Sequence, residues 1–149
     1  MALSKKKREE LYHKYGGRCA YCGEPLPERW HADHIEAVIR THEYVRDDRG
    51  RLIFENGRPK IRKTGMMREH LDHMDNMNPS CPPCNLYKSC YSLEGWRKAI
   101  RENFQQYIQR NQALRCAKRF VMLEIIDKPV VFWFEEYERM QEEAENESR

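Results

Sequence analysis

Apolar residues recur every three or four positions in one long stretch of the chain, residues 93–111. Ser92 can cap a helix there, because its side-chain oxygen can accept a backbone N–H of the first turn. This spacing predicts a long helix with one apolar face directed at the core, and it favours core packing over a surface for stacking bases. The apolar positions are Trp96, Ile100, Phe104, Tyr107 and Ile108.

Shorter elements are predicted before and after this helix. Ser4 can cap a helix that ends near Tyr15, because the glycines at positions 16 and 17 accept the left-handed conformation that follows a helix end. Two further helices are expected over residues 84–89 and 113–120. A strand is expected over residues 32–35, and a short buried strand or packing segment over residues 130–134, whereas the Asn- and Pro-rich residues 74–83 predict turns.

Turn sequences divide the segment of residues 40–68. Asp-Arg-Gly at residues 48–50 and Asn-Gly at residues 56–57 flank three apolar residues, which is typical of a hairpin. The segment has nine basic and four acidic residues, a net charge of +5. We expect a protruding hairpin or a partly mobile loop, inserted into the domain at about residues 40–70.

The net charge is distributed unevenly between the body of the chain and its end. The 149 residues carry a formal net charge of +3, but residues 135–149 hold seven acidic and two basic residues, which leaves +8 for residues 1–134. A positively charged body attracts polyanions such as nucleic acid. The pattern predicts one domain over residues 1–134 and a solubilising acidic tail over residues 135–149.

Membrane and secreted classes of protein do not fit the sequence. No segment approaches the roughly 20 apolar residues of a membrane span. The basic cluster at residues 5–8 is followed by two glutamates instead of the apolar region of a signal peptide. We therefore expect a cytoplasmic protein that does not contact a membrane.

Four of the six cysteines form two C-x-x-C pairs that lie far apart in the sequence. Each pair can hold two thiolates close to one ion, and Zn²⁺ binds four such ligands in a tetrahedron. One zinc ion bound by both pairs would stabilise a polar chain, because the free energy of metal binding becomes free energy of folding. A redox pair and four unrelated buried thiols are the alternatives. The predicted zinc ligands are Cys19, Cys22, Cys81 and Cys84, while Cys90 and Cys116 are expected in the core.

Polar residues surround both cysteine pairs in a recognisable order. Residues 31–35 read His-Ala-Asp-His-Ile, Asn76 stands five residues before Cys81, and Asn85 directly follows Cys84. Together with the two C-x-x-C pairs, this order resembles the HNH endonuclease family in its four-cysteine form, with Asn in place of the last histidine. The resemblance covers roughly residues 15–90. The small size of the chain also resembles free-standing phage members, for which the location would be the host cytoplasm.

The resemblance implies an α+β fold, a small zinc-stapled ββα-metal core (His-Me finger) with flanking helices. It also implies that Asp33 and Asn85 hold one Mg²⁺ or Mn²⁺ ion, and that His34 is the general base toward the attacking water. Asn76 would fix the strand and the imidazole by hydrogen bonds, and Lys88 would contact phosphate. Amide and carboxylate oxygens are harder ligands than histidine nitrogens. The site formed by Asp33 and Asn85 therefore disfavours Zn²⁺ and Ni²⁺.

The chemistry is consistent with these residue types. A neutral histidine can accept a proton at physiological pH, and one divalent cation can act as a Lewis acid on phosphate oxygens. Adjacent strand residues point to opposite faces, so Asp33 and His34 would need a bulge or separate orientations to serve one site. His31 shares the face of Asp33 and is a candidate third ligand or phosphate contact.

The resemblance makes DNA the expected substrate, cut by nicking or double-strand cleavage. A single active site cuts one strand at a time, so double-strand cleavage would need a homodimer or two successive nicks. Two other readings are a zinc-stapled nucleic-acid-binding module without catalysis and an RNA-targeting nuclease. The basic residues that we expect to approach the nucleic acid are Arg49, Arg51, Arg58, Arg62 and Lys63.

Overall fold

The computed structural model describes residues 3–148, which form a mixed α+β architecture with small antiparallel sheets. None of the helices within these residues is both long and apolar enough to cross a membrane. In chain order the elements are α1 (Lys5–His13), β1 (His31–His34), β2 (Ile39–Tyr44), β3 (Phe54–Glu55), β4 (Arg58–Pro59), β5 (Ile61–Met67), η1 (Glu69–Leu71), η2 (Met74–Asn76), β6 (Met77–Ser80), α2 (Pro82–Lys88), α3 (Leu93–Arg110), α4 (Gln112–Arg119) and α5 (Trp133–Glu147).

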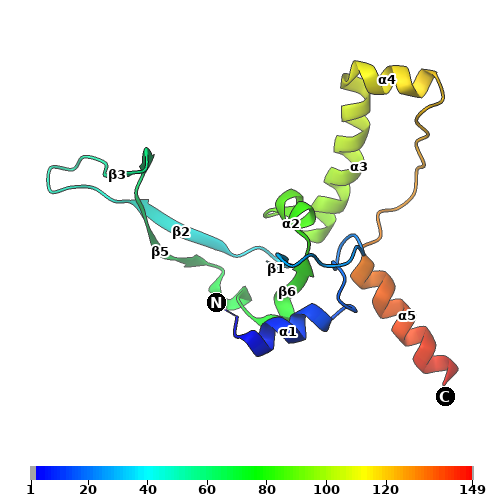
Figure 1. Cartoon of the computed structure of the whole chain (residues 1–149), viewed down its shortest axis with the longest axis horizontal. Helices are drawn as coiled ribbons and strands as arrows, with labels where there is room; N and C mark the ends of the chain where they lie inside the picture. The colour runs from blue at the N-terminus through cyan, green and yellow to red at the C-terminus, as the bar shows by residue number, and fades with distance from the viewer. Residues whose placement is uncertain (1–2, 149) are drawn as a thin grey trace.

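A two-stranded sheet and the helix that follows it form the centre of the molecule (Figure 1). Strand β1 pairs antiparallel with β6, so that Asp33 lies opposite Asn78, and α2 begins two residues after β6. The prediction of turns over residues 74–83 is therefore wrong for β6. Pro79 is tolerated there because its missing N–H costs no ladder bond on a strand paired along only one side.

The core is aromatic and joins segments that are far apart in the sequence. Trp96 at the start of α3 stacks on Phe132, with ring centroids 5.1 Å apart. Tyr21, from the first cysteine pair, meets the Trp96 ring edge-on at 5.0 Å. Leu11 of α1 and Met77 of β6 also belong to this buried cluster. Such aromatic pairs add stability beyond the area that they bury.

Residues 39–67 form a long hairpin arm, β2 paired with β5, that projects from the body (Figure 1). Beyond these strands the arm ends in a loop closed by the Arg46–Leu52 bridge and in the small β3–β4 hairpin, in which Asn56 and Gly57 have φ values of 51° and 75°. These left-handed values are those of the hairpin turn that Asn-Gly favours. Of the two expectations for this segment, the hairpin is the one that the structure shows.

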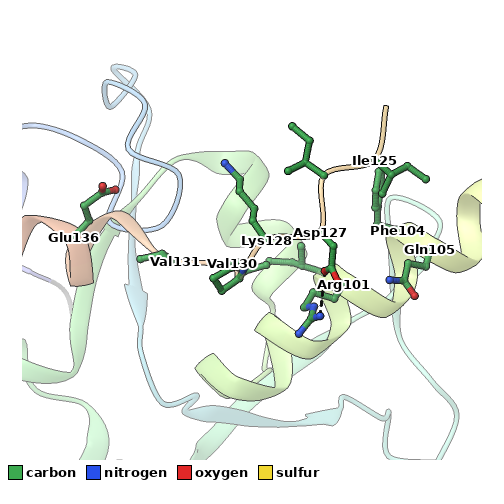
Figure 2. Close-up of a pocket in the computed structure, with 12 residues that line it drawn as sticks. Arg101, Phe104, Gln105, Ile125, Asp127, Lys128, Val130, Val131 and Glu136 are labelled. Carbon is green, nitrogen blue, oxygen red and sulfur yellow. Dashed lines mark hydrogen bonds and ion pairs between the residues drawn. The ribbon is translucent and has the colours of Figure 1, made fainter. Parts of the chain in front are cut away.

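Helix α3 leads away from the body, α4 crosses its far end, and residues 120–132 return beside α3 (Figures 1 and 2). Trp96 and Ile108 are buried, as the spacing of apolar residues along this helix predicts. Phe104 and Tyr107 are instead 48% and 64% exposed, because α4 and the returning chain cover the outer half of α3 only in part. The prediction that the whole apolar face of this helix packs in the core is therefore wrong for these two residues.

The acidic end of the chain is helical. Residues 130–132 form a packing segment and not a strand, with Phe132 buried in the core. From Trp133 the structure has α5 where a frayed tail was expected, because Glu135 caps the helix start by accepting the backbone N–H of Phe132 at 2.9 Å. Acidic residues in a first turn also interact favourably with the helix dipole. The backbone N–H groups of Trp133 and Phe134 bond to Tyr21 and Ala20, which attaches α5 to the first cysteine pair.

Candidate metal centre and the adjoining polar pocket

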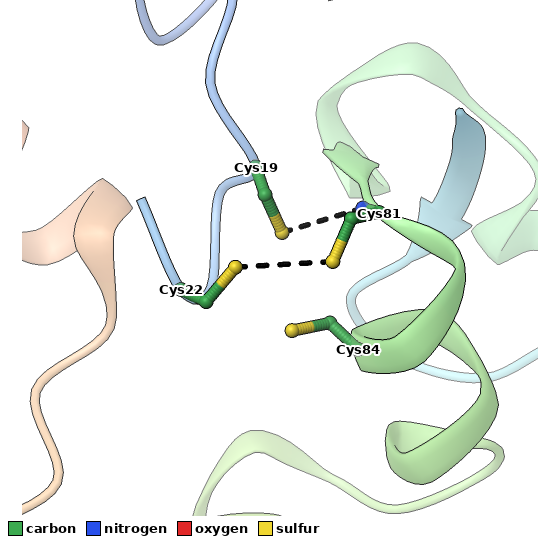
Figure 3. Close-up of side chains that lie close together, drawn as sticks. All are labelled: Cys19, Cys22, Cys81 and Cys84. Atoms are coloured by element: carbon green, nitrogen blue, oxygen red, sulfur yellow. Dashed lines mark hydrogen bonds between the residues drawn. The ribbon is translucent and has the colours of Figure 1, made fainter. Parts of the chain in front are cut away.

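The two C-x-x-C pairs meet in space. One sulfur from each of Cys19, Cys22, Cys81 and Cys84 lies within 4.8 Å of the others (Figure 3). The Sγ atoms of Cys22 and Cys81 are 3.8 Å apart. That separation exceeds a disulfide bond of about 2.05 Å, and it matches the edge of about 3.8 Å that a tetrahedron with 2.3 Å Zn–S bonds requires. The cluster could hold one zinc ion.

Local backbone structure builds each half of this cluster. The first pair lies in a tight turn, where Gly23 has φ of +74° and its N–H bonds to the Cys19 carbonyl at 3.0 Å. The second pair lies where β6 passes into α2, and Pro82 occupies the first helical position, which needs no N–H donor. The backbone N–H of Cys81 donates to Cys19 Sγ at 3.3 Å, which joins the two halves.

Electrostatics within the cluster favour a bound cation. A hydrogen bond from Cys84 lowers the pKa of Cys19 to about 4, and burial raises the pKa of Cys22 to about 11. The hydrogen bond to Cys19 and burial raise the pKa of Cys84. Four thiolates therefore cannot coexist here alone, whereas a dication would stabilise all of them.

The remaining cysteines lie outside this cluster. Cys90 is exposed and Cys116 is half-buried, so the expectation that both belong to the core is wrong. Both positions lie on parts of the chain that face solvent, at the end of α2 and on α4.

Tyr21 connects the cysteine cluster to Asp33 of β1. Its hydroxyl donates to Asp33 Oδ2 at 2.5 Å, and both side chains are buried. Burial and then the charge of Asp33 raise the pKa of Tyr21, so the phenol keeps the proton that it donates. Asp33 is thus held by a residue that stands between two of the zinc-ligand positions.

Lys88 is the second partner of Asp33. Its Nζ lies 3.0 Å from Asp33 Oδ2 and donates to the His34 carbonyl at 2.6 Å, and the residue has no exposed surface. The expectation that Lys88 contacts phosphate is therefore wrong for this structure. The last turn of α2 directs the ammonium inward, where it neutralises a buried carboxylate instead of reaching substrate.

A polar pocket of about 270 Å³ opens beside β1, and Asp33, His34 and Asn85 line it together. His31 and Arg40 also border it. Asp33 and His34 reach the same pocket without a bulge in the β1–β6 pairing, since His34 is the last residue of the strand. The structure therefore brings together three residues that the sequence places up to 52 positions apart.

The imidazole of His34 has a carboxylate partner that the sequence analysis missed. Its Nε2 lies 2.9 Å from Asp72 Oδ1, and the two side chains are only 12% and 10% exposed. A carboxylate at this distance accepts a hydrogen bond from Nε2–H and fixes the ring orientation. No motif singles out Asp72, because it lies in an irregular loop between η1 and η2.

Asn76 holds the backbone around this pocket. Its Nδ2 donates to the carbonyls of Glu36 and Leu71 at 2.9 and 2.8 Å, and its Oδ1 accepts from the Glu36 N–H at 2.9 Å. These bonds join the end of β1 to the loop that carries Asp72. The imidazole of His34 bonds to Asp72 and not to Asn76, so only the strand-fixing half of the expected role is seen.

The five basic residues expected to approach nucleic acid are exposed on the hairpin arm, away from the pocket. Arg62 is paired with Glu43, and Arg51 is paired with Asp47 at 2.8 Å. Within residues 3–148, no ion pair is formed by the side chains of the other three, which are Arg49, Arg58 and Lys63.

Comparison of the chain with protein-family models, curated proteins and solved structures finds no match. The function is therefore inferred from the chemistry of the site.

Proposed function

We propose that this protein is a metal-dependent HNH-type endonuclease that hydrolyses DNA phosphodiester bonds. The observation that supports the proposal is the pocket lined by Asp33, His34 and Asn85. A two-stranded antiparallel sheet followed by a helix, beside a four-cysteine cluster, supplies these residues. This arrangement is the one that a zinc-stapled ββα-metal nuclease would need.

Asp33 and Asn85 would hold the catalytic Mg²⁺ or Mn²⁺ ion, since carboxylate and amide oxygens are the ligands that these ions prefer. When bound, the ion would act as a Lewis acid on the phosphate. Tyr21 and Lys88 both bind Oδ2 of Asp33, so Oδ1 would be the oxygen that binds the ion. Their bonds restrict the carboxylate to one orientation, which favours a preorganised site.

His34 would accept the proton of the attacking water. Because Asp72 accepts the Nε2–H hydrogen bond, Nδ1 keeps the lone pair that takes this proton. The water oxygen then forms a bond to phosphorus while the bond to the 3′ oxygen breaks. The products would carry a 5′-phosphate and a 3′-hydroxyl, and the 3′ oxygen takes its proton from solvent.

The hairpin arm would hold the DNA backbone. Its basic side chains Arg49, Arg51, Arg58, Arg62 and Lys63 are exposed and lie outside the pocket, as expected for groups that bind phosphates without reading sequence, whereas Arg40 at the base of the arm borders the pocket. The conformation of the arm is set by local backbone pairing, so we expect substitutions of the five residues outside the pocket to leave it intact.

Cleavage of supercoiled plasmid DNA with added Mg²⁺ or Mn²⁺ tests the proposal. We expect His34→Ala to lower the cleavage rate by about 10²–10⁴-fold, the usual contribution of a general base. Asp33→Asn and Asn85→Ala should instead raise the metal concentration needed for half-maximal rate. The control is His73→Ala, because His73 is an exposed histidine on the loop that carries Asp72 and lies outside the pocket.

Three outcomes would contradict the proposal. Tight DNA binding without cleavage at any metal concentration would indicate the non-catalytic binding module. Cleavage of RNA but not of DNA would indicate the RNA-targeting nuclease. Equal loss of activity in His34→Ala and His73→Ala would remove His34 from the reaction.

A further inference from the structure

The outer part of the molecule exposes large apolar side chains over one connected segment. They belong to the outer half of α3, to the end of α4 and to the returning chain. Contiguous apolar exposure of this kind marks an interaction site more often than a bare surface. The residues are Phe104, Tyr107, Phe120, Val121, Met122, Ile126 and Val131, between 48% and 87% exposed.

Part of this surface is a groove of about 580 Å³ between α3 and residues 125–131, which we call the α3 groove (Figure 2). Ile100 and Phe104 line it on the helix side, and Ile126 and Val130 line it on the other. Glu136, from the first turn of α5, borders the groove. The α3 groove therefore has apolar walls. Two of its charged residues, Arg101 and Asp127, pair with each other at 3.3 Å, and Lys128 and Glu136 add one charge of each sign.

The end of α4 combines apolar side chains, which suit the apolar walls of the groove, with basic side chains, which are opposite in charge to the acidic helix α5. We call residues 115–122 the basic tip: Arg115, Lys118 and Arg119 precede the apolar Phe120, Val121 and Met122. Val121 has φ of +58°, a costly conformation for a β-branched residue, and it is 87% exposed. Strain combined with full exposure favours a contact that stabilises this conformation.

The basic tip and the acidic helix cannot meet within one molecule. Residues 103–123 hold four basic residues and no acidic residue, whereas α5 holds seven acidic residues and one arginine. Arg97, in the first turn of α3, binds Glu135 at 2.6 Å, so α5 starts beside the N-terminal end of α3. The basic tip lies at the other end of α3, whose 18 residues span about 27 Å.

We propose that two copies of this chain form a two-fold dimer in which the α3 helices run antiparallel. Antiparallel pairing places the basic tip of each copy at the α3 groove and the start of α5 of the other. The apolar end of the tip then covers the groove, and Lys118 and Arg119 face Glu136 and Glu143 of the partner copy. The contact is reciprocal and therefore closes at two copies, and the charges set its orientation.

The dimer would also carry two of the proposed active sites. Only this consequence rests on the proposed nuclease function, because the dimer itself is argued from the α3 surface. Cleavage and association are therefore measured separately. A protein that dimerises without cutting DNA would disprove the proposed nuclease function and support the dimer. A monomer that cuts DNA would support the nuclease function and disprove the dimer.

Charge exchange between the two surfaces tests the dimer. One variant carries Lys118→Glu and Arg119→Glu, and a second carries Glu136→Lys and Glu143→Lys; all four positions are exposed. We expect sedimentation equilibrium of the zinc-loaded full chain to show a dimer, and each variant alone to dissociate at least tenfold more readily. An equimolar mixture should recover the dimer, because both reciprocal contacts then join opposite charges.

The matched control is Glu142→Lys with Glu145→Lys, which makes the same charge change on the other side of α5 and should leave the dimer unchanged. The dimer is overturned if the unmodified chain is a monomer at about 100 μM, or if both variants stay dimeric. The dimer is also overturned if an equimolar mixture of the two variants does not recover dimerisation. Loss of DNA binding without a change in mass for the Lys118→Glu, Arg119→Glu variant would assign the basic tip to nucleic acid instead.

Discussion

The body around the cysteine cluster and the hairpin arm are held together in opposite ways. In the body, residues distant in the sequence contact one another: Tyr21 binds Asp33, Cys81 binds Cys19, and Trp96 stacks on Phe132. In the arm, the contacts are those between neighbouring strands, and nearly every side chain is exposed. Stability is therefore concentrated in the body, while the arm is available to carry charge.

The polar groups of the two regions differ in the same way. The Lys88–Asp33 pair is buried, so each charge depends on the other and on the Tyr21 hydroxyl. The Arg51–Asp47 pair in the arm is exposed, and pairs of this kind contribute about 0–1 kcal/mol. Substitutions should accordingly have large effects on folding in the body and small effects in the arm.

The largest effect is expected from Cys81→Ser with Cys84→Ser. Losing two of four ligands would remove the link that a zinc ion bound by the cluster makes between the two halves of the body, and structural zinc contributes on the order of 10 kcal/mol of apparent binding free energy. We expect loss of the cooperative thermal transition in circular dichroism and loss of one bound zinc per chain. Cys90→Ser, at an exposed cysteine outside the cluster, is the control. A retained transition with one zinc ion would refute the link.

A smaller but still large effect is expected from Lys88→Met. The change leaves Asp33 charged and buried without its cation, which costs about 3–5 kcal/mol. Urea unfolding at constant zinc measures the loss. Lys98→Met provides the comparison, since Lys98 is 73% exposed on α3 and should change stability by less than about 0.5 kcal/mol. Similar values for the two variants would show that the buried pair is not what holds β1 against α2.

The smallest effect on stability is expected from Arg58→Ala with Lys63→Ala on the arm. The free energy of unfolding should change by less than about 0.5 kcal/mol, because both side chains are exposed. DNA affinity should fall, and the slope of log affinity against log salt should decrease by about 2, one for each lost phosphate contact. Lys98→Ala with Arg139→Ala removes the same charge elsewhere. An equal change of slope in that control would mean that the arm has no special role.

The features that the sequence predicts correctly are local ones. Asn56-Gly57 forms the expected tight turn, Ser92 caps the long helix, and the first C-x-x-C pair lies in a tight turn closed by Gly23. Each of these depends on backbone preferences within a few residues. The meeting of the two cysteine pairs was also predictable, because four thiolates in two pairs suit one tetrahedral ion.

The errors arise where a distant partner decides the conformation. Met77–Ser80 is a strand because β1, more than 40 residues earlier, pairs with it. Phe134 belongs to a helix because the first cysteine pair accepts its backbone N–H, although its apolar neighbours favour a strand. Short apolar runs are ambiguous between strand and helix until such contacts are known.

The sequence by itself determined the residue types: four thiol ligands, an Asp-His pair and two asparagines, and a basic segment interrupted by turns. The tertiary structure alone decided which of them share a pocket, that Lys88 is buried against Asp33, and that Asp72 is the partner of His34. The reason is physical. Ligand chemistry belongs to each side chain, whereas burial and hydrogen-bond partners depend on how segments far apart in the chain pack against one another.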